Sequence, residues 1–425
     1  MRLGVWPGGR RGPPRSFAVV GDAAWRPLRF GSLPFQLEWR RPKSSRWELS
    51  FRLPAGAVCS GLGENCSGRL NLRSRSWTLF ATDDPLHVET MDAMYKSIPL
   101  LVVIYRGRST GLFLDSPARQ RWDLDSGLAG RAGVQLLTRR GWQLYAMGPA
   151  PLPKIVEAYT RLTGRSHLPP LWSLGHQQSR WSYPDQKTVL SIAKEFRARR
   201  IPCDAIVLDI DTMEGYRVFT HSRKNFPGFK KMITDLARRN FRVVTIIDPG
   251  VKKDPRYPIY ADGLNRGMFC RTSAGKVFID KVWPGDAAFP DFLRGDVRAW
   301  WGSKHAFYFD NGVSGIWNDM NEPSLFNNQK PLPKAAAELP PDGKQLFVQQ
   351  APEGPVGHFE VRNLYGFQMS RATFDGWREL RPAERPFILT RSGFFILSSG
   401  IIARSDFARR SPGHSVARLK LNAGS

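Results

Sequence analysis

Two carboxylic acids three positions apart are the clearest chemical signal in this sequence. Asp319 and Glu322 lie in the run Gly315-Ile-Trp-Asn-Asp-Met-Asn-Glu-Pro323, between a short apolar lead and a proline that stops regular structure. The pattern is typical of a buried strand that presents carboxylates at its C-terminal end, where barrel and open-sheet enzymes keep their chemistry. The alternative is a strand that simply ends in acidic residues, without a chemical role.

A second acidic pair, Asp209-Ile-Asp211, follows the apolar run Ile206-Val-Leu208. Three interpretations are open for it. It is a solvated strand end, or a metal and nucleotide clamp of the kind found in sugar-nucleotide transferases, since such metals favour oxygen ligands. In the third interpretation the carboxylates accept hydrogen bonds from sugar hydroxyls, which charged acceptors do well.

Two further residues complete the candidate chemistry. Trp283 lies in the loop Val282-Trp-Pro-Gly-Asp286 and either packs there or forms the wall of a sugar subsite. Arg391 ends an apolar strand and is either exposed or paired with a carboxylate. A pair with Asp319 would hold that carboxylate ionised, because a nearby opposite charge lowers the pKa of an acid.

The elements that must position these residues alternate between strand and helix from Trp172 to Arg391. The expected strands are Trp172–Gln177, Ala205–Asp211, Phe241–Asp248, Gly315–Asn318 and Pro386–Thr390. The expected helices run from a cap at Asp185 to about Arg199, then over Phe229–Arg239, Ala299–Phe309 and Val361–Leu380. Apolar strands joined through helices predict a parallel sheet. Acidic and basic residues at successive strand ends favour part of a (β/α)8 barrel, about five βα units, over a doubly wound sheet, which would show a Gly-rich loop after its first strand.

Before this region the pattern is that of short β-strands. The expected strands are Trp47–Leu53, Trp77–Ala81, Ser97–Tyr105, Gly111–Leu114 and Trp142–Met147, with Gly61-Leu-Gly-Glu64 as a turn between strands and Ile155–Leu162 as a helix. Short strands at this spacing predict a β-sandwich. The resulting domain boundaries are an irregular basic N-terminus at 1–46, a sandwich at 47–148, an incomplete barrel at 149–394 and an aberrant basic tail at 395–425.

Five motifs together resemble glycoside hydrolase family 31, the α-glucosidases and related α-glycosidases. They are Leu208-Asp-Ile-Asp211, Ile247-Asp-Pro-Gly250, Val282-Trp-Pro-Gly285, Trp317-Asn-Asp-Met-Asn-Glu-Pro323 and Leu389-Thr-Arg-Ser-Gly-Phe394. They occur in the family's order, and the region before Pro149 resembles the family's N-terminal galactose-mutarotase-like β-sandwich through Gly61-Leu-Gly-Glu64 and Thr82-Asp-Asp-Pro85.

The resemblance implies a role for each matching residue. Asp319 corresponds to the nucleophile of a retaining exo-acting α-glucosidase, and Glu322 to a supporting acid of the same motif. The residues implied in substrate binding are Asp209, Arg391, Trp283 and, from the N-terminal domain, Asp83. The implied substrate is an α-glucoside or malto-oligosaccharide, from which α-glucose is released, and no metal or organic cofactor is implied. An α-xylosidase or an α-glucan lyase stays open.

The sequence departs from the family after Phe394. The family's acid/base aspartate lies in Trp-Thr-Gly-Asp-Asn, which this sequence does not contain, and Asp406 has the wrong neighbours to replace it. We therefore expect a chain truncated before that motif, with impaired activity and exposed strand edges. A milder departure is Arg362, which stands where the family commonly has histidine.

Composition narrows the partners and the location. A net charge of +26 is compatible with a nucleic-acid partner. However, the basic residues near the two ends of the chain do not alternate with aromatic residues, so no nucleic-acid partner is expected. No apolar run approaches the roughly 20 residues of a membrane span, and residues 1–20 lack the apolar core of a signal peptide. Four scattered cysteines without a CxxC pair predict a cytoplasmic protein. The oligomeric state stays open.

Three hypotheses about function follow, in this order. The first is a family 31 α-glucosidase, the second a non-catalytic sugar-binding remnant of the same family, and the third a DxD-type glycosyltransferase that needs Mn²⁺ and a nucleotide sugar.

Overall fold

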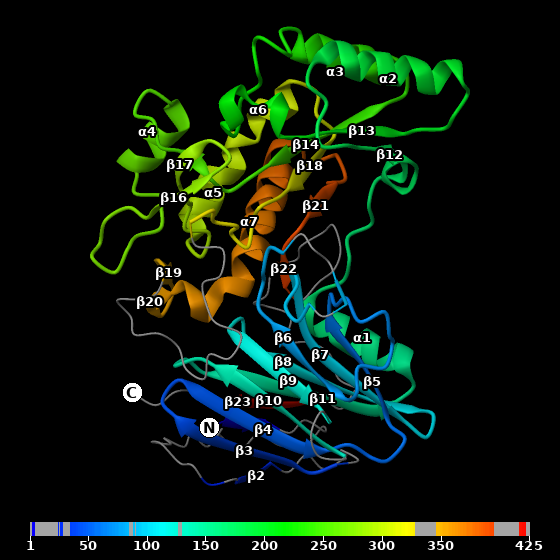
Figure 1. Cartoon of the computed structure of the whole chain (residues 1–425), viewed down its shortest axis with the longest axis vertical. Coiled ribbons are helices and arrows are strands. Elements are labelled where there is room, and N and C mark those ends of the chain that lie inside the picture. The colour runs from blue at the N-terminus through cyan, green and yellow to red at the C-terminus, as the bar shows by residue number, and fades with distance from the viewer. Residues whose placement is uncertain are drawn as a thin grey trace.

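The computed structural model consists of a β-sandwich and a parallel α/β segment, with the long helix α7 (His358–Leu380) between them (Figure 1). The structure describes residues 2–4, 24, 26–28, 35–84, 88–89, 91–125, 130–327, 346–394 and 416–421. Among these residues no helix is both long and apolar enough to cross a membrane.

The sandwich is built from two sheets packed face to face. One sheet has the order β1-β23-β11-β8-β7-β22, with β5 also paired to β7, and the other has the order β2-β3-β4-β10-β9-β6. The strands of the first sheet are β1 Arg2–Gly4, β23 Val416–Leu421, β11 Trp142–Ala150, β8 Arg108–Asp115, β7 Lys96–Tyr105, β22 Gly393–Phe394 and β5 Val58–Gly63. Those of the second are β2 Arg26–Leu28, β3 Leu37–Lys43, β4 Arg46–Arg52, β10 Arg131–Leu137, β9 Arg119–Leu124 and β6 Arg75–Leu79.

Alternation of apolar and polar residues explains these strands. Along β3, Leu37 and Trp39 are buried while Glu38 is exposed, as expected of a strand with one face on the core. The core between the sheets is rich in tryptophan, and Trp47 packs edge-on against Trp142 with ring centroids 5.7 Å apart. Such pairs add to the stabilisation that burial of their area already supplies.

Three expectations about the sandwich need correction. Residues 1–46 were expected to be irregular, but β2 and β3 lie there and extend the sheet of β4. The segment Gly61–Glu64 is not a turn, since Gly61 and Gly63 belong to β5 and flank a bulge opposite β7. The last residues were expected to form an aberrant tail, yet β23 pairs with both β1 and β11. The partners of β23 lie far away in the sequence, whereas β3 was missed although it pairs with the next strand, β4.

The parallel segment confirms the predicted partial barrel. Its five strands have the order β12-β13-β14-β18-β21 and are β12 Gln177–Gln178, β13 Ala205–Leu208, β14 Arg242–Ile247, β18 Gly315–Asn318 and β21 Ile388–Thr390. The helices are α1 Leu152–Thr163, α2 Gln186–Ala198, α3 Phe229–Arg238, α4 Pro258–Asn265, α5 Gly295–Lys304, α6 Ala306–Asp310 and α7. Smaller strands form a three-stranded sheet, β15 Val251–Lys252, β16 Ile279–Val282 and β17 Gly285–Ala288, and a hairpin, β19 Val348–Ala351 and β20 Gly354–Gly357.

The helix signals of the sequence are confirmed for α1, α2, α3 and α7, whereas the expected helix Ala299–Phe309 is divided between α5 and α6 at His305. The Asp185 carboxylate accepts a hydrogen bond from the Thr188 N–H and so caps α2. The first expected strand, Trp172–Gln177, is wrong over most of its length. Leu171–Leu174 forms a 3-10 turn instead, because the Ser173 N–H and hydroxyl both donate to the Pro170 carbonyl. The residues of this turn are exposed or half-buried.

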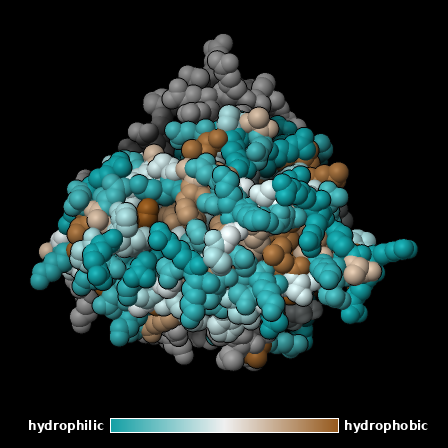
Figure 2. Space-filling view, turned by 90° about the horizontal axis from the view of Figure 1, so that it is seen from above, coloured by the Kyte–Doolittle hydropathy of each residue, from teal (hydrophilic) through white to brown (hydrophobic). Residues whose placement is uncertain are grey.

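Helix α7 connects the two parts of the molecule. It packs closely on α5 because Gly376 and Gly302 meet there, and a Cβ on Gly376 would lie 2.4 Å from the Cα of Gly302. Beyond β21 the chain passes into the sandwich, where β22 pairs with β7 in parallel. The barrel segment and the sandwich therefore share a strand pairing as well as a helix. Seen from the barrel end, the surface is mostly hydrophilic with scattered apolar side chains (Figure 2).

Candidate active site

Strand register brings three charged residues to the same level of the parallel sheet. Ile247 of β14, Asn318 of β18 and Thr390 of β21 are aligned in neighbouring strands. The next residue of each strand is Asp248, Asp319 and Arg391, so these three follow one another across the carboxyl ends of the sheet. That edge is where parallel α/β enzymes keep their active sites.

The backbone around Asp319 is held on both sides. Its N–H donates to the Ile247 carbonyl at 3.0 Å, while the side chain of Asn318 hydrogen bonds to Ser370 and Thr373 of α7. Since successive side chains of a strand point to opposite faces, Asp319 is directed away from α7. Met320 then takes a left-handed φ of 51°, which is uncommon for a non-glycine residue and ends the strand abruptly. The Asp319 residue is 9% exposed.

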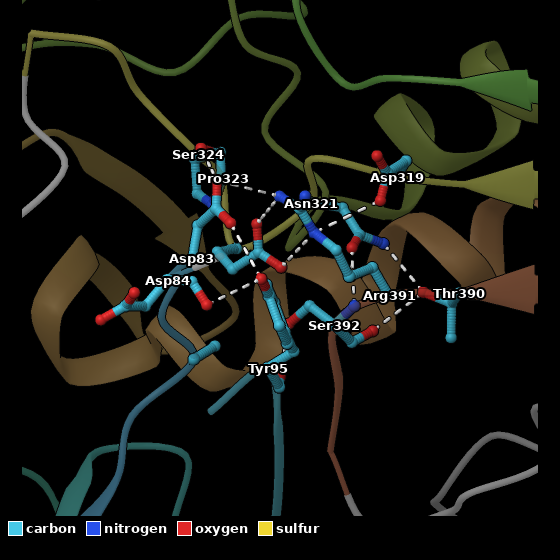
Figure 3. A network of polar contacts seen from close by, with 12 residues as sticks. Asp83, Asp84, Tyr95, Asp319, Asn321, Pro323, Ser324, Thr390, Arg391 and Ser392 are labelled. Carbon is cyan, nitrogen blue, oxygen red and sulfur yellow. Dashed lines mark hydrogen bonds and ion pairs between the residues drawn. The ribbon is translucent and has the colours of Figure 1, made fainter. Parts of the chain in front are cut away.

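Arg391 is the centre of an ion-pair network (Figure 3). Its Nε and Nη2 donate to the two carboxylate oxygens of Glu322 at 3.1 and 2.6 Å. The same guanidinium lies 3.3 Å from Asp319 Oδ1 and 3.5 Å from Asp83 Oδ2. Of the two alternatives that the sequence left open for Arg391, pairing with a carboxylate is the one present. The bidentate partner, however, is Glu322, a fully buried residue.

Asp83 reaches this network from the sandwich, as Figure 3 shows. Its Oδ2 accepts a hydrogen bond from the Ser324 hydroxyl at 2.5 Å, and its Oδ1 accepts one from the Tyr95 hydroxyl at 3.1 Å. The guanidinium of Arg391 also lies over the Tyr95 ring, 5.0 Å from its centroid. Burial and the neighbouring Asp83 carboxylate raise the pKa of Tyr95, so its hydroxyl stays a donor.

Burial raises the pKa of Asp319 to about 6, although Arg391 lowers it and Glu322 raises it further. The expected effect of Arg391 is therefore present but smaller than that of burial. At pH 7 the ionised form of Asp319 still exceeds the protonated form by roughly ten to one. Burial alone would lower the pKa of Arg391, but Glu322, Asp319 and Asp83 outweigh burial and raise it.

Asp248 lies beside Asp319 in surroundings that disfavour its charged form. Burial first, and then the charge of Asp319, raise the pKa of Asp248 well above its usual range. The residue is 4% exposed, and within the described part of the chain its Oδ1 has no hydrogen-bond partner. Two neighbouring carboxyl groups in this position disfavour the ionisation of both at once.

The two aspartates of the DxD pair have different surroundings. Asp209 follows β13, its Oδ1 accepts the Ile210 N–H at 2.7 Å, and burial raises its pKa. Its charge also raises the pKa of Asp319, which places it within electrostatic reach of that carboxylate. Asp211 instead hydrogen bonds to the Tyr216 hydroxyl. Within the described residues no group of three or more His, Cys, Asp or Glu side chains is arranged to hold a metal ion.

Trp283 lies in an aromatic cluster rather than in the ion-pair network. Its ring centroid is 5.3 Å from that of Phe326, 5.8 Å from Trp181 and 6.4 Å from Tyr216. Trp181 is 71% exposed and Phe326 is 39% exposed. Because Phe326 follows Glu322 by four residues, the cluster adjoins the segment that carries the carboxylates and offers a partly exposed aromatic surface beside it.

The structure therefore groups Asp83, Asp319, Glu322 and Arg391 tightly, with Asp209 nearby and Trp283 further out. Sequence reasoning missed Tyr95, for which no local pattern exists. It noted Asp248 as a polar strand end without choosing it as a site residue, although alignment of the strand ends would have placed it beside Asp319.

Comparisons with known proteins agree with this architecture. Residues 166–397 match the glycosyl hydrolases family 31 TIM-barrel domain. Residues 18–123 match the glycosyl hydrolase 31 N-terminal galactose mutarotase-like domain, which begins within the segment that was expected to be irregular.

Several curated proteins are similar over most of this chain. The chain is 42% identical over 338 residues to "Alpha-glucosidase 2" of Bacillus thermoamyloliquefaciens, covering 79% of this chain and 41% of that protein. It is 31% identical to the "Alpha-glucosidase" of Saccharolobus solfataricus and 33% identical to human "Neutral alpha-glucosidase AB". The chain spans 38% to 49% of the length of these three relatives.

Solved structures show the same fold. A family 31 dextranase of Flavobacterium johnsoniae complexed with glucose matches with a TM-score of 0.74 and 25% identity, covering 89% of this chain and 47% of that one. A family 31 α-glucosidase from Bacteroides thetaiotaomicron matches with a TM-score of 0.66 and 32% identity, covering 81% of this chain and 54% of that one.

Proposed function

The chain belongs to glycosyl hydrolase family 31, and from this premise we propose that it takes part in the retaining hydrolysis of α-glucosides, with Asp319 as the nucleophile. The observation that supports this most directly is the position of Asp319 at the end of β18, nearly buried and ion-paired with Arg391. Relatives named as α-glucosidases point to an α-linked glucose unit, either an α-glucoside or a malto-oligosaccharide.

In the proposed reaction an oxygen of Asp319 attacks the anomeric carbon. A bond forms between this oxygen and the carbon, and the glycosidic bond breaks through an oxocarbenium-like transition state. The leaving oxygen takes a proton from solvent water. A second water then attacks the anomeric carbon of the glycosyl ester, gives its proton to solvent and releases α-glucose and the free Asp319 carboxylate. The nucleophile must be ionised, which the pKa of about 6 for Asp319 permits at neutral pH.

The surrounding groups support this role for Asp319. Arg391 provides positive charge 3.3 Å from the carboxylate, while its hydrogen bonds to Glu322 fix the position of the guanidinium. Burial and the charge of Asp319 raise the pKa of Asp248 well above its usual range, which disfavours a further negative charge at the adjacent strand end. Asp209 and Asp83 are the proposed acceptors for sugar hydroxyls, because carboxylates make strong charge-assisted hydrogen bonds.

A substrate whose leaving group needs no proton tests the nucleophile alone. We expect 2,4-dinitrophenyl α-glucoside to release its phenol faster with the wild-type chain than with Asp319→Ala, by at least about 10³-fold. The matched control is Asp310→Ala, since Asp310 is an exposed aspartate at the end of α6.

Covalent trapping provides the second measurement. Incubation with 5-fluoro-α-glucosyl fluoride should add one glycosyl unit, located on Asp319 by peptide mass spectrometry, in the wild type and in Asp310→Ala but not in Asp319→Ala. Release no faster than that of Asp319→Ala, together with no adduct, would overturn the proposal. Saturable binding of maltose without an adduct would replace it by the sugar-binding function.

A further inference from the structure

One buried cation has no place in the proposed reaction. Arg362 lies in the second turn of α7 and is 2% exposed. A fully buried arginine is costly unless its donors are satisfied and its charge is compensated. Its partners therefore indicate what the residue does.

The Arg362 guanidinium contacts two loops that come from different parts of the molecule. Its Nε donates to the Ala81 carbonyl at 2.6 Å, and its Nη2 donates to the Pro323 carbonyl at 3.4 Å. Ala81 precedes Asp83 by two residues, and Pro323 directly follows Glu322. A single side chain thus joins the sandwich loop that carries Asp83 to the barrel loop that carries Glu322.

The next residue of α7, Asn363, holds the other side of the same loop. Its Oδ1 accepts the Ala81 N–H at 2.7 Å and the Ser97 hydroxyl at 3.1 Å, and its Nδ2 donates to the Leu79 carbonyl at 3.3 Å. Both backbone polar groups of Ala81 are therefore bound by adjacent side chains of one helix. Ala81 is fully buried, so water cannot replace these bonds without opening the interface.

A polar chain behind Arg362 keeps the guanidinium in this orientation. Nη1 of Arg362 lies 3.2 Å from Nε2 of His358, which is one helical turn earlier. Burial and the Arg362 charge hold the pKa of His358 well below its usual range, so Nε2 accepts this bond. The other ring nitrogen, Nδ1, then donates to Gln349 Oε1 at 3.2 Å, and Gln349 Nε2 donates to Asp291 Oδ1 at 3.4 Å.

The positive charge of Arg362 is compensated by carboxylates of the candidate active site. Burial lowers its pKa to about 10, and the carboxylates of Glu322 and Asp83 act in the opposite direction. The guanidinium therefore stays protonated at neutral pH and adds a second positive charge that, like Arg391, acts on the carboxylates of Glu322 and Asp83. Gly366, one turn further along α7, allows this close approach, because a Cβ there would lie 2.7 Å from the Asn321 carbonyl.

We propose that Arg362 and Asn363 are positioning residues that hold the sandwich loop against the barrel, so that Asp83 stays in contact with Ser324 and Arg391. This inference rests on the proposed function for its kinetic consequences but not for its structural one. Breaking the clasp, defined as Arg362 and Asn363 with their bonds to Ala81, should release Asp83 while Asp319 keeps its place in the sheet.

The kinetic test compares Arg362→Met with Asp83→Asn on the activated aryl α-glucoside. Arg362→Met should raise KM by about tenfold, the value of one lost charge-assisted bond, and leave kcat within about twofold. In the Asp83→Asn background the same substitution should add little, because the two changes remove one contact. Arg362→Lys keeps the charge but cannot bridge two carbonyls in fork geometry, so it should restore only part of the loss.

The structural test is amide hydrogen exchange of residues 79–84, with Arg371→Met as the matched control. Arg371 lies on the same helix but pairs only with the half-exposed Asp375 among the ion pairs of the described residues. Exchange should accelerate by about tenfold in Arg362→Met and stay unchanged in Arg371→Met. If Arg362→Met does not fold, Arg362→Lys and Asn363→Ser carry the same comparison with smaller perturbations.

Unchanged exchange in the clasp variants overturns the inference, as does a KM effect that adds fully to that of Asp83→Asn. If the wild-type chain neither forms the adduct on Asp319 nor releases the phenol, the proposed function fails. In that case the exchange measurement alone decides whether the clasp exists.

Discussion

Two regions of the molecule bring carboxyl groups to the surroundings of Arg391, but they are positioned by different means. The barrel rim consists of the strand ends that carry Asp248 and Asp319, and the sandwich loop is the segment that carries Asp83. Asp248 and Asp319 follow β14 and β18, whose backbones are hydrogen-bonded in register. Asp83 follows no such ladder and is held by side chains, namely Ser324, Tyr95 and, through Ala81, Arg362 and Asn363. The rim is thus part of the sheet, whereas the sandwich loop is attached to it.

The difference predicts unequal tolerance to change. A one-residue shift of a strand would turn every side chain of that strand to the other face, so the rim cannot move without loss of the sheet. A side-chain contact between two domains can be lost while both cores remain. Substitutions at the rim should therefore damage both stability and chemistry, and substitutions at the sandwich loop should mainly damage binding.

The largest effect on folding is expected from Arg391→Met. The change leaves Glu322, whose side chain is fully buried, without its bidentate partner. Breaking a buried pair in this way costs about 3–5 kcal/mol of unfolding free energy. Urea denaturation measures it, with Arg199→Met as the control because the pair of Arg199 with Glu195 is exposed and worth under about 1 kcal/mol. Equal losses in the two variants would contradict the central place given to Arg391.

A smaller effect is expected from Asp83→Asn. The amide keeps the size of the side chain but removes its charge, so kcat/KM on the activated aryl α-glucoside should fall by about tenfold, or about 1.4 kcal/mol. Asp319→Asn should instead cost at least about 10³-fold, since no other described residue takes the place of the nucleophile at the end of β18. If kcat/KM falls as far in Asp83→Asn as in Asp319→Asn, the sandwich loop and the rim are equally important for the reaction, which contradicts the comparison.

The pH profile separates the two regions further. Burial raises the pKa of Asp319 from 3.8 to about 6, so the rate should rise with pH along a limb centred near 6. Asp209 raises this pKa, and Asp209→Asn should move the limb to lower pH. Asp83→Asn should leave the limb in place, because burial and rim charges dominate the pKa of Asp319. If the acid limb of the pH–rate profile moves equally in Asp209→Asn and Asp83→Asn, the rim and the sandwich loop do not differ in their effect on the pKa of Asp319.

The same shift affects stability with a definite sign. The folded state binds the Asp319 proton more tightly than the unfolded state does, so this contribution is present in full below pH 3.8. It is lost as the pH rises from about 4 to 6. Urea unfolding of the wild type and of Asp319→Asn across this range should show that only the wild type loses this increment of stability.

The smallest effect is expected at the aromatic cluster, outside both regions. Trp181→Ala removes a ring that is 71% exposed and contacts Trp283. Affinity for maltotriose should fall by about threefold to tenfold, while unfolding free energy changes by less than about 0.5 kcal/mol. Calorimetric titration measures the first quantity, with Leu70→Ala as the control because Leu70 is 87% exposed on the sandwich. An unchanged affinity would restrict binding to the rim.

Much of the barrel segment was predictable because its signals are local. The apolar face of α3, which buries Phe229, Met232, Ile233 and Leu236, repeats at helical spacing within ten residues. The strand ends at 209, 248, 319 and 391 were each visible as an apolar run that stops at a charge. The sandwich was harder. Strand β23 pairs with β1 and β11, which lie far away in the sequence, and β3 was missed although it pairs with the next strand, β4.

By itself the sequence determined the order of the βα units, the family and the identity of the acidic residues, because periodicity and motif spacing are properties of contiguous residues. Only the tertiary structure decided which of them meet. Asp83 and Ser324 are 241 positions apart, and Arg362 and Ala81 are 281 apart, yet both pairs are hydrogen-bonded. It likewise decided that burial outweighs Arg391 in setting the pKa of Asp319, since desolvation depends on every element packed around a carboxylate and not on its neighbours in the chain.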